Sequence, residues 1–227
     1  MKKSQPPLDT IITLDGPAGT GKGTITRLLA KKLGWHYLDS GALFRILAYT
    51  ALAQQLDLED DATLSTLATS LEIIFQDGQI FLSGKEITSD IRTETVGEAA
   101  SKIAVLPGVR TALAEKQREF YQSPGLVADG RDMGTVIFPN AILKFFLDAS
   151  IQERAKRRQY QLKKSGITVS LGDILRDLKQ RDTRDTTRRI SPLIPAPDAI
   201  IIDTTTLSVD EVFARIIAFS QKKLGHD

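Results

Sequence analysis

The chain of 227 residues contains no cysteine, which excludes disulfide bonds, thiolate catalysis and zinc-thiolate sites. Its two histidines, His36 and His226, are far apart in the sequence and belong to no metal-binding motif, so structural or solvated roles are expected. Thirty basic and 28 acidic residues leave a net charge of +2. This balance is too even for a general nucleic-acid or membrane surface, so any phosphate binding must come from local clusters.

Long hydrophobic runs are also missing. No run approaches transmembrane length, and the N-terminal stretch "MKKSQPPLD" has lysines without the apolar segment of a signal peptide. We therefore expect a cytoplasmic protein with neither membrane nor nucleic-acid partners, and a monomer. A hydrophobic content of 41% is enough to bury a full core and suits one α/β domain spanning residues 1–227.

What the sequence does contain is a glycine-rich stretch, "LDGPAGTGKGT", directly behind an apolar run. Glycines allow main-chain N–H groups to point inward, and the helix that follows adds its positive dipole end, so such a loop suits a polyphosphate. An ordinary glycine-rich turn would not explain why strand, loop, lysine and helix occur together. The pattern predicts a P-loop for ATP, formed by Gly16, Pro17, Ala18, Gly19, Thr20, Gly21, Lys22, Gly23 and Thr24.

One position departs from the strict P-loop pattern. The pattern places Ser or Thr directly after the lysine as a Mg²⁺ ligand, whereas here Gly23 follows Lys22 and the hydroxyl comes later, at Thr24. The metal must therefore be held differently. The version GxxGxGKGT is similar to the loop of nucleoside monophosphate kinases.

Short apolar runs alternate with helical patterns along the chain, which predicts an α/β fold with helices covering a parallel sheet. The P-loop is then expected at the carboxyl end of the first strand, where open α/β sheets bind ligands. Helices are expected around Leu43–Ala51 and Val109–Phe120, and capping boxes at Ser150 and Ser208. The five expected core strands are residues 10–14, 35–38, 126–128, 143–147 and 199–202.

Two segments break this alternation. In residues 71–87, Asp77-Gly78 and Ser83-Gly84 are turn signals between three β-prone runs, which predicts a small antiparallel meander outside the main sheet. The segment 153–189 is charged, with a break expected at Ser165-Gly166, and is suited to close over the phosphates.

Basic residues gather where an acceptor phosphate would lie. Arg131 follows the third expected strand, and Arg181 and Arg188 share one helix face with Asp185 between them; Arg154 and Arg158 are four residues apart. A solvated face with surface ion pairs is the alternative for either cluster alone. Beside a P-loop, fixed guanidinium groups would instead offset the repulsion between two polyanions.

The chain resembles bacterial cytidylate kinases over nearly its whole length. The resemblance rests on "DGPAGTGKGT", "LDSGALFR", "IRTETVGEAASKIAVLPGVR", "ADGRDMGTVIFP", "FLDASIQERAKRR" and "RDTRDTTRRISPLIPAPDA", of which "DGRDMGT" is highly specific. It implies a P-loop NTPase core with a five-stranded parallel sheet, a small antiparallel nucleoside-monophosphate-binding insert at residues 65–92 and a short helical lid at residues 154–180. It also implies phosphoryl transfer from ATP, with Mg²⁺, to CMP or dCMP. Phe44 stands where a tyrosine is common.

The resemblance also implies individual roles. Ser40, Arg45, Arg131 and Arg188 would hold or approach the acceptor phosphate; Ser101, Arg110 and Asp132 would face the cytosine; Arg181 and Asp185 would face the sugar. Asp129 resembles the carboxylate that holds Mg²⁺ through water. The catalytic set is then expected to be Lys22, Arg131, Arg188, Arg154 and Arg158.

The expected mechanism is direct in-line transfer without a phosphoenzyme, because the acceptor oxygen is already an anion. A P-loop hydrolase or switch is a rival hypothesis, although the guanine-reading N-K-x-D run is missing and "GKGT" is the wrong loop type. A non-catalytic nucleotide-binding module is a third, against which the intact Lys22 and the arginines speak. Separate measurement of ADP and of phosphorylated acceptor distinguishes the three.

Overall fold

The computed structural model describes residues 10–76, 78–164 and 166–225. The stretch "MKKSQPPLD" and the turn residues Asp77 and Ser165 lie outside these described residues. The chain divides into two compact units, which are described separately. The larger comprises Met1–Leu38 and Phe120–Asp227, and the smaller comprises Asp39–Glu119.

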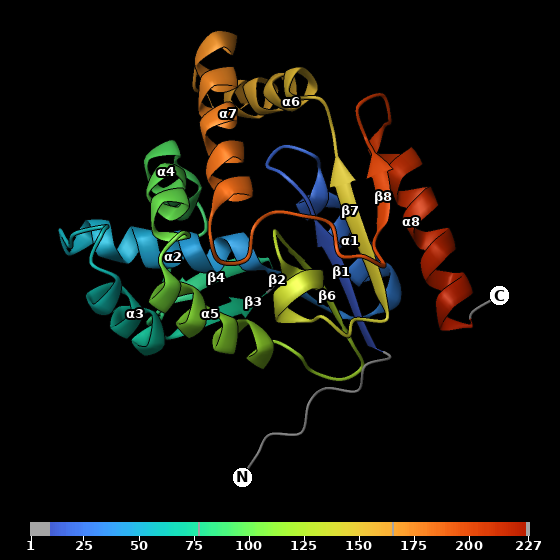
Figure 1. Cartoon of the computed structure of the whole chain (residues 1–227), viewed down its shortest axis with the longest axis horizontal. Coiled ribbons are helices and arrows are strands. Elements are labelled where there is room, and N and C mark those ends of the chain that lie inside the picture. The colour runs from blue at the N-terminus through green and yellow to red at the C-terminus, as the bar shows by residue number, and fades with distance from the viewer. Residues whose placement is uncertain (1–9, 77, 165, 226–227) are drawn as a thin grey trace. The chain divides into compact units, whose positions relative to one another are not determined.

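The larger unit is built on a five-stranded sheet in the order β2-β6-β1-β7-β8 (Figure 1). β1 pairs in parallel with β6 and with β7, and β7 pairs in parallel with β8. The predicted parallel sheet is confirmed, with strand ends displaced by one or two residues. The strands are β1 (Ile11–Asp15), β2 (His36–Asp39), β6 (Leu126–Gly130), β7 (Leu143–Asp148) and β8 (Ile200–Asp203).

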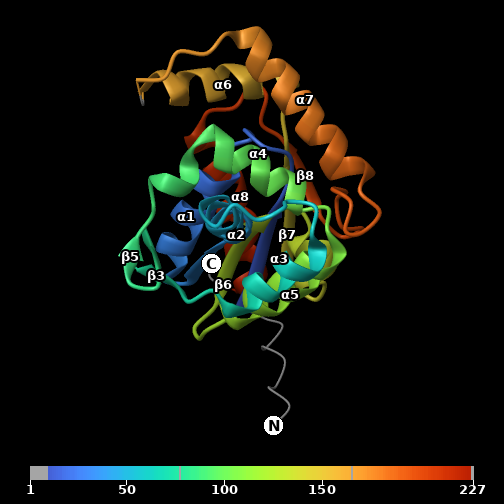
Figure 2. The same ribbon diagram turned by 90° about the vertical axis from the view of Figure 1, so that its left-hand side faces the viewer.

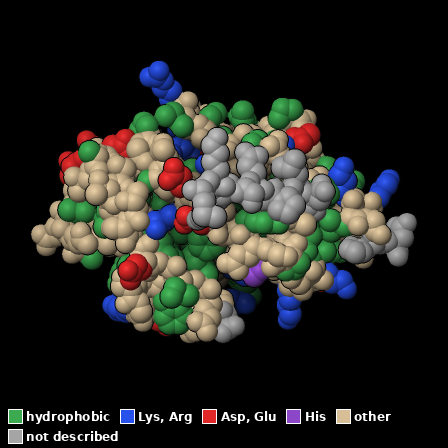
Figure 3. All heavy atoms as spheres, turned by 90° about the horizontal axis from the view of Figure 1, so that it is seen from below, with side chains coloured by type: hydrophobic (Ala, Val, Ile, Leu, Met, Phe, Trp, Pro, Cys, Tyr) green, Lys and Arg blue, Asp and Glu red, His purple; other side chains and the backbone are tan. Residues whose placement is uncertain are grey.

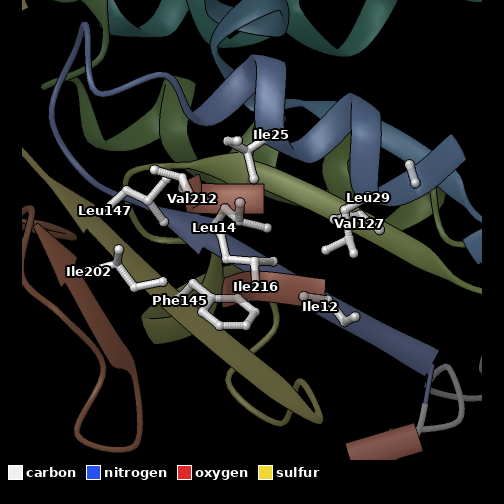
Figure 4. Packing of buried hydrophobic residues seen from close by; sticks show 11 residues of the cluster. Ile12, Leu14, Ile25, Leu29, Val127, Phe145, Leu147, Ile202, Val212 and Ile216 are labelled. Atoms are coloured by element: carbon white, nitrogen blue, oxygen red, sulfur yellow. The ribbon is translucent and has the colours of Figure 1, made fainter. Parts of the chain in front are cut away.

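Two helices, α1 (Lys22–Leu33) and α8 (Val209–Leu224), pack against one face of this sheet. Figure 4 shows Ile25 of α1 and Ile216 of α8 meeting Leu14 and Phe145 from the strands. Because side chains alternate along a strand, Thr13 and Asp15 of β1 point to the opposite face. Because the apolar residues of β1 are buried under α1 and α8, the polar side chains of Thr13 and Asp15 lie on the opposite face of the sheet.

Local signals set the ends of these helices. Gly34 ends α1 in the left-handed region at φ 67°. Ser208 and Glu211 form the predicted capping box at the start of α8. At Ser150, the hydroxyl accepts the predicted bond from the Glu153 N–H at 3.3 Å.

A pair of helices, α6 (Ile151–Lys164) and α7 (Leu171–Thr187), follows β7. α6 lies beyond the carboxyl ends of β7 and β8, and α7 runs back from that level (Figures 1 and 2). The pair has a small apolar cluster of its own, made by Ala155 and Leu162 of α6 with Ile174 and Leu178 of α7. These helices contain the segment that the sequence predicts to be charged and suited to closing over phosphates.

In the described residues of the smaller unit, four α-helices accompany a separate antiparallel sheet in the order β3-β4-β5. This sheet confirms the meander predicted for residues 71–87. The elements of the unit are α2 (Ser40–Ala53), α3 (Asp61–Ser70), β3 (Ile73–Gln76), β4 (Gln79–Leu82), β5 (Lys85–Glu86), a 3₁₀ turn (Asp90–Arg92), α4 (Glu94–Ile103) and α5 (Pro107–Glu119).

The surface agrees with the even charge balance. On the face shown in Figure 3, acidic and basic side chains stand among other residues rather than forming one patch of a single sign. Within the described residues, no helix is both long enough and apolar enough to span a membrane.

Candidate functional site

The glycine-rich loop runs from the end of β1 into α1, as a P-loop requires. Two glycines of the loop have positive φ angles and close neighbours, which together disfavour a side chain. Gly16 has φ 142°, and a Cβ on it would lie 2.0 Å from the carbonyl oxygen of Leu147 in β7. Gly19 has φ 83°, and its Cβ would lie 3.0 Å from the Cβ of Arg154 in α6. The neighbouring elements therefore require glycine at both positions.

Side chains bind the carbonyl groups of this loop. Lys22 Nζ donates to Pro17 O at 2.7 Å, Arg154 Nη1 to Ala18 O at 3.2 Å, and Thr204 Oγ1 to Thr20 O at 3.2 Å. These bonds hold the main chain of the loop in place, and its glycines suit an anion-binding nest of main-chain N–H groups. The loop is thus prepared to accept phosphate oxygens.

Lys22 is the buried cation of the loop and is 6% exposed. Burial lowers the pKa of Lys22 to about 7; the charge of Arg131 lowers it as well, while Asp129 and Asp15 act in the opposite direction. A polyphosphate beside Lys22 would favour the charged form and offset this desolvation. The position of Lys22 suits charge stabilisation at bound phosphates.

The residues around Asp129 fit the hydrated Mg²⁺ of a kinase. Asp129 is in β6, 6% exposed, and its Oδ2 would lie 3.2 Å from a Cβ placed on Gly23. Glycine at position 23 therefore keeps this carboxylate clear. Among the described residues, no group of three or more acidic or histidine side chains forms a protein-only metal cage. Mg²⁺ is commonly held by one or two carboxylates, waters and substrate phosphates, and Asp129 suits that arrangement.

Asp132 is the N-cap of a five-residue π-helical turn, Met133–Ile137, that follows β6. Its side chain is 3% exposed. Asp15, the last residue of β1, accepts the main-chain N–H groups of Met133 at 2.8 Å and Gly134 at 2.7 Å. Burial raises the pKa of Asp15 to about 6, although these two bonds lower it.

Arginines meet around Asp185 near the end of α7. Arg131 Nε donates to Asp185 Oδ2 at 3.0 Å, and Arg188 Nη1 lies 3.5 Å from Oδ1. Burial alone would raise the pKa of Asp185, but the charges of Arg131, Arg181 and Arg188 hold it below its usual value. Arg181 and Asp185 lie on α7 as predicted, but Arg188 is the residue after the helix and has an extended backbone, so the predicted helix face is only partly present. Asp185 holds two predicted phosphate ligands together.

Arg154 and Arg158 differ in their surroundings. The Arg154 guanidinium pairs with both carboxylate oxygens of Asp182 in α7, at 3.1 and 2.6 Å, and its Nε donates to Ala149 O. Arg158 Nη1 instead contacts Gln161 at 3.5 Å on its own helix. Arg154 thus links the P-loop, α6 and α7 in this structure, and the catalytic role expected for both arginines stays a prediction.

In the smaller unit, the predicted phosphate ligands are held by main-chain and side-chain contacts. Arg45 Nη1 donates to the carbonyl groups of Ile91 at 2.9 Å and Thr93 at 3.2 Å. A Cβ on Gly97 of α4 would lie 2.8 Å from Arg45 Nη2, so glycine leaves space for this guanidinium. The Ser40 hydroxyl donates to Gln117 Oε1 at 2.6 Å.

The predicted base ligands of the smaller unit are both buried. Ser101 is 5% exposed, and its hydroxyl has no hydrogen-bond partner among the described residues. Arg110 donates to Ala104 O at 2.9 Å, and its guanidinium lies 5.6 Å from the ring centroid of Phe44. The Phe44 ring, at the position where a tyrosine is common, therefore packs beside this guanidinium. A buried hydroxyl without a partner is suited to a ligand contact.

The predicted site residues fall into two groups, one in each unit. The larger unit contains Lys22, Asp129, Arg131, Asp132, Arg181, Asp185 and Arg188. The smaller unit contains Ser40, Arg45, Ser101 and Arg110. Sequence reasoning did not find Asp15, Asp182 or Arg157, whose Nη2 donates to Thr204 O at 2.6 Å. The sequence contained a signal for Asp15, because an acidic residue at the end of an apolar strand is unusual enough to indicate a specific role. It contained no such signal for Asp182 or Arg157.

Sequence comparisons with known proteins indicate one family. A family model described as cytidylate kinase matches residues 12–222. A cytidylate kinase of Aeromonas hydrophila subsp. hydrophila is 49% identical over 224 residues, which cover 97% of this chain and 97% of the relative. The cytidylate kinase of Stutzerimonas stutzeri (strain A1501) is 53% identical, covering 92% and 93%. That of Colwellia psychrerythraea is 49% identical over 229 residues, covering 99% and 100%.

Proposed function

This chain belongs to the cytidylate kinase family, and we propose that it transfers the terminal phosphoryl group of ATP to CMP or dCMP. The products are ADP and CDP or dCDP. The observation that carries the proposal is the combination, within one unit, of a P-loop lysine and two arginines joined by Asp185. This arrangement provides fixed positive charge for a donor and an acceptor phosphate.

The transfer is direct and in line. The acceptor phosphate oxygen is already an anion, so positioning and charge stabilisation supply most of the catalysis. Lys22 and the loop N–H groups hold the donor phosphates, and Arg131 and Arg188 approach the acceptor phosphate. Asp129 would hold Mg²⁺ through water, and when bound the ion offsets charge on the donor phosphates.

The predicted ligands of the acceptor nucleotide are given the following roles. We assign Ser40 and Arg45 to the acceptor phosphate, Ser101, Arg110 and Asp132 to the base, and Arg181 with Asp185 to the sugar side. Residues 65–92 serve as the nucleoside-monophosphate-binding insert and residues 154–180 as a lid that excludes water. With dissolved nucleotides as substrates, we further propose a cytoplasmic enzyme; its monomeric state stays a prediction.

A panel of acceptors tests the proposed reaction. The protein is incubated with Mg-ATP and CMP, dCMP, UMP or no acceptor, and ADP and the nucleoside diphosphate are quantified separately. We expect equal amounts of ADP and CDP, and far less ADP without an acceptor. Release of ADP without CDP would indicate a hydrolase, and nucleotide binding without either product would indicate a binding module.

Base choice gives a mutational prediction. Ionised Asp132 accepts from the cytosine amino group but meets a carbonyl oxygen on uracil, so UMP should be a poor substrate. Asp132→Asn provides an NH₂ that donates to this oxygen. We expect the CMP-to-UMP ratio of kcat/KM to fall at least about tenfold, roughly 1.4 kcal/mol.

Steady-state kinetics on both nucleotides measure this ratio. The matched control is Asp60→Asn, the same chemical change at the N-cap of α3, where the carboxylate accepts from Thr63. An unchanged ratio in folded Asp132→Asn would move base reading to Ser101 or Arg110.

A further inference from the structure

Asp15 is a buried carboxylate that the phosphate-binding pattern does not require, since the P-loop pattern begins at the next residue, Gly16. Asp15 ends β1 in the middle of the sheet, where it is in register with Gly130 of β6 and Phe146 of β7. Gly16 lies against the main chain of Leu147, which leaves no space for displacement toward β7. The position of Asp15 is therefore fixed from both sides.

The two carboxylate oxygens of Asp15 accept from two successive main-chain amides. Oδ1 accepts from Met133 at 2.8 Å and Oδ2 from Gly134 at 2.7 Å. These are the two residues that directly follow Asp132. The Asp132 carbonyl in turn accepts from Val136 at 2.9 Å and Ile137 at 3.2 Å. The main chain that carries the Asp132 side chain is thus held from both directions.

The same turn packs tightly against the sheet. A Cβ on Gly134 would lie 2.9 Å from Thr13 Oγ1 and 3.1 Å from Lys144 Cδ. On the other side of Asp132, Arg131 Nη1 bonds to Gly130 O at 3.0 Å. The placement of the Arg131 and Asp132 side chains therefore depends on one turn, and Asp15 is the side chain that fixes that turn to β1.

Only a carboxylate matches these two donors with both of its oxygens. Asparagine would turn an NH₂ toward one of the amides, and alanine would leave two buried N–H groups unsatisfied. A buried carboxylate is costly to desolvate, and burial raises the pKa of Asp15 accordingly. Asp15 is costly to bury and is not part of the phosphate-binding pattern. Its two hydrogen bonds to the turn therefore indicate a positioning role.

We propose that Asp15 is a positioning residue for base choice, which acts through the turn that carries Asp132 and does not itself touch the nucleotide. This inference rests on the proposed function and on base reading by Asp132. It extends that function by assigning a role in acceptor specificity to the residue that directly precedes the P-loop.

The test is the CMP-to-UMP ratio of kcat/KM in Asp15→Asn, with the KM for ATP measured beside it. We expect the ratio to fall about fivefold or more, because a displaced Asp132 loses part of one net hydrogen bond. The KM for ATP should change by a smaller factor than the ratio, since the P-loop N–H groups and Lys22 remain and Asp15 is only one of the two carboxylates that favour the charged form of Lys22. A ratio that stays at the wild-type value, or a KM for ATP that rises as much as the ratio falls, would overturn the inference.

A double-mutant cycle separates action through Asp132 from any other route. In the Asp132→Asn background, adding Asp15→Asn should change the ratio less than about twofold. Additive effects of the two substitutions would contradict a role through Asp132. The control for lost stability is Ile216→Val, which removes one buried methyl group on the opposite face of the sheet and should leave the ratio unchanged.

A second variant keeps the inference testable when Asp15→Asn does not fold. Gly134→Ala keeps the Asp15 carboxylate in the chain but displaces the turn that bonds to it, so it should shift the ratio in the same direction. Adding Thr13→Ala removes the hydroxyl that the new Cβ would meet and should restore part of the ratio. A normal ratio in folded Gly134→Ala would overturn the inference. A wild type that forms no CDP from CMP would overturn the proposed function. A wild type that forms CDP but does not prefer CMP to UMP would overturn base reading by Asp132, and this inference with it.

Discussion

Lys22→Met is expected to lower turnover by about 10²–10³-fold, the range for loss of one preorganised donor at developing charge. Lys22 Nζ lies within the glycine-rich loop, 2.7 Å from Pro17 O and 3.5 Å from Thr20 Oγ1. Methionine keeps an unbranched chain of similar length and loses the charge. The effect should appear mainly in kcat, because charge on the transferring group develops in the transition state.

The variant should remain folded. Burial disfavours the charged form of Lys22, so replacing it with an apolar side chain removes a desolvation cost. We therefore expect a Tm equal to or above that of the wild type. A low Tm together with low turnover would mean that the loop has collapsed, and the loss could not then be assigned to the missing charge.

The matched control is Lys116→Met in α5. Lys116 Nζ also donates to a main-chain carbonyl, that of Leu71, at 2.8 Å. The control removes the same kind of bond from a lysine outside the predicted site, and turnover should stay within about twofold, as expected of a substitution away from the chemistry. Near-normal turnover in Lys22→Met would remove Lys22 from its proposed role.

Features encoded by neighbouring residues were predictable from the sequence. The β1 run, the glycines behind it and the apolar spacing of α1 predict strand, loop and helix, and Gly34 predicts where α1 ends. The meander follows from its turn glycines and β-prone runs. In each case the signal lies within a few residues of the feature, so periodicity and turn chemistry are sufficient.

Pairings between distant segments were not predictable in this way. Arg154 and Asp182 are separated by 28 positions, and the spacing of Arg154 to Arg158 does not reveal which of the two pairs with α7. Asp15 meets Met133 and Gly134 across more than a hundred residues. Such contacts depend on strand order, and only the fold brings β1 beside β6 and the turn that follows it.

Asp185 shows how the fold changes the interpretation of a predicted residue. The sequence resemblance places Asp185 at the sugar, where loss of one hydrogen bond would affect CMP and dCMP together or CMP alone. In the structure, its two oxygens meet Arg131 and Arg188. A change at Asp185 therefore alters the phosphate ligands as well as any sugar contact.

Asp185→Ala is accordingly expected to lower kcat/KM for CMP and dCMP by at least about 10²-fold each. Removing one partner of a buried charge pair costs about 2–5 kcal/mol, and here two guanidinium groups would be left side by side. The ratio of CMP to dCMP should change little if holding the arginines is the main role. A loss confined to CMP would instead indicate a contact with the 2′-hydroxyl.

The control for Asp185→Ala lies on the same helix. Asp173 in the first turn of α7 forms an ion pair with Arg176, and both side chains are about half exposed. Exposed pairs contribute little, so Asp173→Ala should leave kcat/KM within about twofold of the wild type. Arg188→Met alone and combined with Asp185→Ala completes a cycle, in which the combined loss should be smaller than the product of the two single losses. Wild-type kcat/KM for both nucleotides in folded Asp185→Ala would show that neither the arginines nor the sugar depend on this carboxylate.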